Sequence, residues 1–178
     1  VVHFTNNLFK MALVGKNTDK SVLIHFGIPA ILTSFAGAWL LLKITDMPGL
    51  FHYQINGRDF EVTPVKIVIA LLLIVFSILE ITPAFEKLQF GKNKLFLGGM
   101  LSGFFGGLSG IQGAIRSAFL VKSGLSKEAY IATGVMIASL VDFTRLSVYA
   151  SRFASARLHD TLPLLLSATL SAIAGAYL

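Results

Sequence analysis

Long apolar runs, separated by short polar segments, divide the chain into helices of membrane length. The full runs are residues 21–42, 64–83, 95–121, 128–150 and 160–178, and residues 1–14 form the end of a further helix. A helix of about 20 apolar residues spans the hydrocarbon core of a bilayer. The pattern therefore predicts an all-α, polytopic integral membrane protein.

The polar segment 43–63 contains the signature of a β-hairpin. Two alternating stretches, 51–55 and 58–62, flank the dipeptide Asn56-Gly57. Asn-Gly between alternating stretches is the strongest short-range hairpin signal. We expect this segment to be a loop outside the bilayer that carries a hairpin.

Two short sequence matches recur at nearly the same spacing. Residues 2–5 (VHFT) match residues 141–144 (VDFT), and residues 35–40 (FAGAWL) match residues 173–178 (IAGAYL). We infer an internal duplication; the alternative is that helices rich in small residues resemble one another. If every run crosses the bilayer in turn, both copies of the last helix point the same way, which predicts two parallel helical repeats.

These observations divide the chain into three parts. Residues 1–42 are the C-terminal part of a first membrane repeat, residues 43–63 are the extracytoplasmic loop with its hairpin, and residues 64–178 are a second membrane repeat. The chain begins inside an apolar stretch and not with methionine. We therefore expect further residues before Val1.

Composition supports the membrane class and excludes several others. Hydrophobic residues make up 54% of the chain and charged residues 13%, against about 25% charged in soluble domains. The net charge of +6 is explained by lysines and arginines in short loops, so no nucleic-acid partner is expected. The chain has no cysteine, which excludes disulfides and thiolate metal sites, and no cofactor is expected.

The distribution of basic residues predicts an orientation, because cytoplasmic loops carry an excess of lysine and arginine. With the loops alternating across the bilayer, eight basic residues fall on one side and five on the other. The first side, predicted to be cytoplasmic, holds Lys10, Lys16, Lys20, Lys87, Lys92, Lys94, Arg152 and Arg157. The other side holds Lys43, Arg58, Lys66, Lys122 and Lys127.

The run 95–121 differs from the others in its glycines. They occur at positions 98, 99, 103, 106, 107, 110 and 113, although each glycine costs a helix about 1 kcal/mol relative to alanine. In a membrane, small residues allow helices to approach closely, and a break frees N–H groups where it lines a cavity. We predict a glycine-interrupted transmembrane helix whose break holds an anion. The alternative is that the glycines serve only tight packing.

A helix that restarts near Gly113 would place Arg116 in its first turn. The free N–H groups, the helix dipole and a guanidinium together form an anion site, and Ser109 and Gln112 would add hydrogen bonds. The alternative is that Arg116 extends to the membrane surface.

Further charges lie in the run 128–150, where intramembrane charges mark a transport pathway by default. Asp142 and Arg145 are three residues apart and can pair on one helix face. Together with Arg116 they sum to +1, which suits an anion. Thr133 could line the same cavity or bond to its own helix. The candidate substrate-binding residues are Gly106, Gly107, Ser109, Gly110, Gln112, Gly113, Arg116, Thr133, Asp142, Arg145, Asn6 and Asn7.

The motifs around this stretch resemble those of the TauE/SafE sulfite exporter family, also called the 4-toluene sulfonate uptake permeases. They are the glycine pattern of 98–113, the loop Gly124-Leu-Ser-Lys-Glu-Ala129 and the dipeptide Ala132-Thr133. Residues 6–10 and 26–29 are similar to the end of the family's first half. The resemblance implies two four-helix repeats, transport of sulfite or sulfonate-type anions, and proton coupling. The glycine motif of the first half is absent.

We therefore expect a permease of the inner (plasma) membrane that moves a small, sulfur-containing anion by alternating access. Its partners would be the anion and the lipid bilayer, with a homo-oligomer left open. The sequence lacks HExxH, P-loop and G-x-S-x-G motifs, so an enzyme is not expected. The alternatives are an anion channel, or a non-transporting membrane subunit that docks a partner through Gly99 and Gly103.

Overall fold

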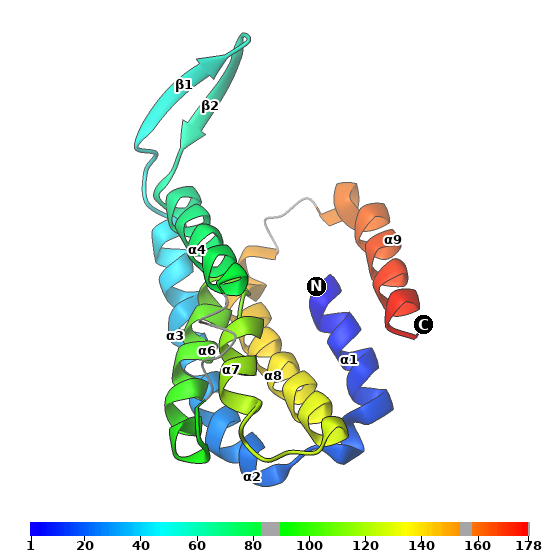
Figure 1. Ribbon diagram of the computed structural model, residues 1–178. Coiled ribbons are helices and arrows are strands. Elements are labelled where there is room, and N and C mark those ends of the chain that lie inside the picture. The colour runs from blue at the N-terminus through cyan, green and yellow to red at the C-terminus, as the bar shows by residue number, and fades with distance from the viewer. Residues whose placement is uncertain (83–89, 154–157, 178) are drawn as a thin grey trace.

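Figure 1 shows the computed structural model of the chain, which describes residues 1–82, 90–153 and 158–177. Pro83, Lys87, Arg157 and Leu178, on which parts of the predicted topology depend, lie outside the described residues. Among the described residues, three helices are long and apolar enough to cross a membrane, namely Lys20–Thr45, Pro64–Ile81 and Lys127–Ala150. The prediction of an all-α membrane protein is confirmed at this level.

The elements follow one another in the order of the apolar runs. They are α1 (Val2–Val14), η1 (Gly15–Asn17), α2 (Lys20–Val22), η2 (Leu23–Gly27), α3 (Ile28–Thr45), β1 (Phe51–Ile55), β2 (Arg58–Val62), α4 (Pro64–Ile81), η3 (Lys92–Lys94), α6 (Leu95–Ser109), α7 (Gly113–Leu120), α8 (Lys127–Phe153) and α9 (Leu158–Tyr177).

The helix from Lys20 to Thr45 contains a π-helical segment, η2, just before Pro29. Proline has no N–H to donate, and its ring clashes with the carbonyl four residues earlier. The backbone accommodates both effects by widening to a π-helix. At the start of this helix, the Asp19 carboxylate accepts a hydrogen bond from the Val22 N–H at 2.8 Å, which is an N-cap.

Helix α6 packs closely along α3 through three glycines at four-residue spacing. A Cβ atom at Gly99, Gly103 or Gly107 would collide with a carbonyl oxygen of the facing backbone. Those oxygens belong to Phe26, Ala30 and Ser34. Tight helix packing therefore accounts for these three glycines, one of which, Gly107, is a candidate substrate-binding residue.

The run 95–121 is interrupted, but its chain turns back. Helix α6 ends at Ser109, Gly110 adopts a left-handed conformation (φ +81°), and α7 begins at Gly113. A Cβ at Gly98, near the start of α6, would collide with the Phe119 ring near the end of α7. The two helices form a helical hairpin that starts and ends at one end of the bundle (Figure 1). The prediction that this run crosses the bundle is wrong, because the left-handed glycine reverses the chain.

This reversal also changes which loops share an end of the bundle. Helix α8 runs parallel to α3: at one end the Asp19 N–H donates to Thr133 at 2.9 Å, and at the other Arg152 pairs with Asp46 at 2.6 Å. Arg152 therefore lies at the end opposite to the one predicted, and so do Lys122 and Lys127. We call the end at which Asp19 meets Thr133 the lysine-rich end. It holds Lys16, Lys20, Lys92, Lys94, Lys122 and Lys127. The other end holds Lys43, Arg58, Lys66 and Arg152.

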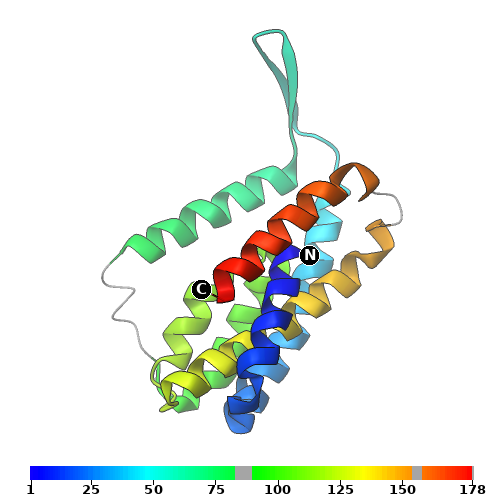
Figure 2. The same ribbon diagram turned by 90° about the vertical axis from the view of Figure 1, so that its right-hand side faces the viewer.

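The helices that carry the matched segments run in opposite directions. Phe4 of α1 packs against Phe143 of α8 with ring centroids 6.3 Å apart, while Asp19, later in the chain, meets Thr133, which lies earlier in α8. Likewise α3 runs away from the lysine-rich end, and α9 runs back toward it beside α1 (Figures 1 and 2). The prediction of parallel repeats is wrong because the α6–α7 hairpin removes one crossing. The helices of each matched pair run antiparallel.

The predicted hairpin is present between α3 and α4. Strands β1 and β2 pair antiparallel with Tyr53 opposite Phe60, and the turn places Asn56 at φ 51° and Gly57 at φ 73°. It projects from the bundle at the end opposite the lysine-rich end (Figures 1 and 2). Helix α4 returns from it and packs through Phe76, whose ring meets Phe105 edge-on at 5.5 Å.

Candidate functional site

A cavity of about 280 Å³ lies where the α6–α7 turn meets α1 and α8. We call it the central cavity. It brings together six of the residues predicted from sequence, which come from three distant segments: Asn7, Gly110, Gln112, Gly113, Arg116 and Asp142. His3, Ile111 and Ala138 complete its lining.

The turn between α6 and α7 is built to expose backbone donors. Gly110 ends α6, and the Ser109 hydroxyl donates to the Phe105 carbonyl at 2.9 Å while accepting from the Ile111 N–H at 3.2 Å. Ser109 therefore stabilises the turn. The Arg116 N–H bonds to the Gln112 carbonyl at 3.0 Å, so the N–H groups of the preceding α7 residues have no acceptor within their own helix. The first turn of α7 thus presents free donors and a partial positive charge.

Two polar side chains beside this turn carry buried atoms without partners. Arg116 Nη1 and Gln112 Oε1 are buried and make no hydrogen bond within the described part of the chain, and Gln112 is only 6% exposed. Buried polar groups are normally paired with protein or water, so both atoms are available for a hydrogen bond at the cavity. The Arg116 side chain lies against Gly134 of α8, so it does not extend to the membrane surface.

Asp142 connects the turn to α1. Its carboxylate accepts a hydrogen bond from the Asn7 amide at 3.2 Å and lies 3.6 Å from the Arg145 guanidinium. The guanidinium of Arg145 occupies the space that a Cβ at Gly110 would need. It therefore sits at the C-terminal end of α6, where the helix dipole favours a cation. The predicted pair forms, and it also holds the turn.

Several predicted residues lie outside the central cavity. Thr133 is fully buried at the lysine-rich end of the bundle, where its hydroxyl accepts a hydrogen bond from the Asp19 N–H. Gly106 faces Gln112 and Val141 without lining the cavity. Asn6 has a buried Oδ1 without a partner in the described residues but is not part of the lining.

Two further residues near the site are not among the candidates predicted from the sequence. His3 lines the cavity. Tyr149 donates from its hydroxyl to the Gly107 carbonyl at 3.3 Å. Helical spacing could have identified Tyr149, because it lies one turn beyond Arg145 on the same face of α8.

With this geometry established, comparison with known proteins identifies the class. The family model described as "Sulfite exporter TauE/SafE" matches residues 1–178. Searches among curated proteins and among solved structures gave no match. The match covers every residue of the chain, and the chain belongs to the sulfite exporter TauE/SafE family.

Proposed function

We propose that this chain is a permease that moves a small, sulfur-containing anion, such as sulfite or an organosulfonate, across the inner membrane. Membership of the family implies a membrane transporter of the sulfite exporter type. The observation that carries the proposal is the start of α7, with Arg116 beside it, at the central cavity. An anion there would be held by backbone donors, the helix dipole and a guanidinium.

The charge at and beside the cavity favours an anion. Arg116 and Asp142 line the cavity, and Arg145 lies outside the lining, 3.6 Å from Asp142, so the three groups together carry +1. An anion would offset the surplus charge, and its oxygens could accept from Arg116. Gln112 would add a hydrogen bond without charge.

We further propose that the α6–α7 hairpin enters the bilayer from the lysine-rich end and returns to it. Helix α6 has 15 residues and α7 has 8, so at 1.5 Å per residue neither reaches the roughly 20 residues of a full span. The non-helical backbone at 110–112 is tolerated in a membrane because it lines a cavity. The lysine-rich end is then cytoplasmic, and the β-hairpin faces the other side.

Inverted repeats supply a route for alternating access, because rocking one repeat against the other exposes a central site to each side in turn. In this proposal residues 1–42 end the first repeat, residues 64–178 form the second, and residues 43–63 connect them outside the bilayer. Asp142 and His3, both at the cavity, are the candidates for proton coupling.

The proposal is tested by sulfite flux in proteoliposomes. Arg116→Ala should abolish flux while the protein still inserts and elutes as a single species. Arg58→Ala removes the same charge from the exposed hairpin and should leave flux unchanged. Wild-type flux in Arg116→Ala would overturn the proposed site. Currents far above carrier rates, without counter-ion dependence, would instead indicate a channel.

A further inference from the structure

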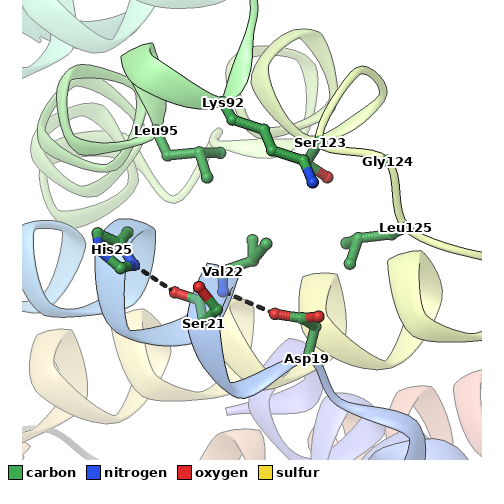
Figure 3. Close-up of a pocket in the computed structure, with 9 residues that line it drawn as sticks. All are labelled: Asp19, Ser21, Val22, His25, Lys92, Leu95, Ser123, Gly124 and Leu125. Atoms are coloured by element: carbon green, nitrogen blue, oxygen red, sulfur yellow. Dashed lines mark hydrogen bonds between the residues drawn. The ribbon is translucent and has the colours of Figure 1, made fainter.

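A second polar cavity lies at the lysine-rich end of the bundle, away from the central cavity. Its volume is about 250 Å³, close to that of the central cavity. Three segments form it: the start of the α2–α3 helix, the η3–α6 junction and the loop from α7 to α8 (Figure 3). We call it the lysine-end cavity.

The polar side chains of this cavity lie on two sides of it. Lys92 and Ser123 lie on one side, and Asp19, Ser21 and His25 lie on the other (Figure 3). Among the described residues, no carboxylate lies within 4.0 Å of the Lys92 amine. Lys92 therefore has no salt-bridge partner in the described part of the chain.

One carboxylate, Asp19, lines the same cavity as Lys92, so the charges within the lining balance. Asp19 is engaged as the N-cap of α2, where its carboxylate accepts the Val22 N–H at 2.8 Å. His25 Nδ1 lies 2.8 Å from the Ser21 carbonyl oxygen; a carbonyl can only accept, so Nδ1 carries a proton and Nε2 remains available. Among the described residues, the loops and helix ends around this cavity carry six lysines and two carboxylates, Asp19 and Glu128, so the surplus positive charge lies around the cavity. Such an excess of one sign around a cleft raises the local concentration of the opposite ion.

Helix α7 separates the two cavities. Its first residues, Gly113 and Arg116, line the central cavity, and Ser123 and Gly124, just past its last residue, line the lysine-end cavity. Between them, Ile115, Phe119 and Leu120 are buried in the apolar core. At 1.5 Å per residue, the eight residues of α7 separate the two cavities by about 12 Å. An anion would pass from one to the other only when this apolar partition moves.

We propose that the lysine-end cavity is a vestibule that binds the same small oxyanion as the central cavity, with Lys92 as its principal ligand. This inference rests on the proposed function and adds a second anion-binding site to the transport pathway. The vestibule lies on one side of the α7 partition, so its effect on transport is side-specific. It concentrates the anion on the lysine-rich side and has no influence on uptake from the opposite side.

The test is the KM for sulfite flux, measured separately from each side of oriented proteoliposomes. Lys92→Gln should raise the KM about tenfold from the lysine-rich side and less than twofold from the other. Lys122→Gln removes the same charge from the same end without touching the cavity, and should change neither KM by more than twofold. Equal effects of the two substitutions, or equal shifts from both sides, would overturn the vestibule. Lys92→Arg keeps the charge and should retain most of the affinity if the glutamine variant inserts poorly.

Direct binding separates this inference from the proposed function. The full chain with Arg116→Ala, purified in detergent, is titrated with sulfite in a calorimeter. Residual binding that Lys92→Gln removes supports the vestibule even if no flux is detected. No residual binding, or residual binding that Lys92→Gln leaves intact, overturns it.

Discussion

The substitution Gly110→Ala tests how the turn between α6 and α7 is held. Gly110 has φ +81°, and a Cβ there would occupy the position of the Arg145 guanidinium. The left-handed backbone costs a residue with a side chain about 1–2 kcal/mol. Displacing Arg145 from the end of α6 adds about 1 kcal/mol for its interaction with the helix dipole.

Together these costs reach about 3 kcal/mol, and each 1.36 kcal/mol is tenfold in a rate or an equilibrium. Sulfite flux in proteoliposomes should therefore fall about a hundredfold. Gly57→Ala is the matched control, because Gly57 also has a positive φ (73°) but no atom within 4 Å of the added Cβ. The Gly57→Ala variant has only the cost of the left-handed backbone, at a position far from the cavity, and should therefore retain flux.

A double substitution, Gly110→Ala with Arg145→Ala, removes the collision but not the backbone strain. If the collision matters, Arg145→Ala should cost less in the Gly110→Ala background than in the wild type. Wild-type flux in Gly110→Ala, or an equal loss in Gly57→Ala, would show that the geometry of this turn does not support transport.

Three further substitutions test the packing and the polar network. Gly103→Val should prevent stable folding, because its side chain meets the Ala30 carbonyl; a monodisperse protein with an unchanged melting temperature would contradict the close approach of α3 and α6. Thr133→Val leaves the buried Asp19 N–H without its acceptor and should lower stability by about 1–3 kcal/mol without changing the KM for sulfite, whereas a changed KM would place Thr133 in the transport route. Asp142→Asn removes the carboxylate that joins α1 to Arg145 and should abolish any dependence of flux on a proton gradient; retained dependence would exclude Asp142 as the proton site.

Local patterns were sufficient to predict the elements of the fold. Apolar runs gave the long helices, and Asn56-Gly57 gave the hairpin turn, because each signal lies within one segment. The glycines of the run 95–121 indicated a break, and α7 does begin at Gly113. These features depend on residues close together in the chain.

The direction of the chain after the break could not be predicted in the same way. A run of 27 residues fits either a crossing helix with an extended break or two short helices that fold back. The decision depends on contacts between distant residues, such as Gly98 with Phe119 and Asp46 with Arg152. One missed reversal was enough to invert the predicted orientation of the later helices.

The sequence predicted the site residues whose chemistry is unusual for an apolar run. It did not predict the residues whose place in the site depends on how the helices pack. Arg116 and Asp142 stood out as charges in apolar runs, and both line the central cavity. Thr133 looked equally suitable but bonds to Asp19, 114 positions away in the chain. His3 lines the cavity only because α1 packs antiparallel to α8, which no local pattern reveals.

The central claim is that the start of α7 binds an anion, and one labelling measurement tests it most directly. The chain has no cysteine, and Gly113 lines the central cavity with no atom within 4 Å of an added Cβ, so Gly113→Cys introduces a single thiol there. Methanesulfonate, which does not react with thiols or maleimides, should slow labelling by N-ethylmaleimide, while Gly57→Cys on the hairpin should label at the same rate with or without it. Equal labelling of Gly113→Cys at every methanesulfonate concentration would contradict an anion site at this helix start.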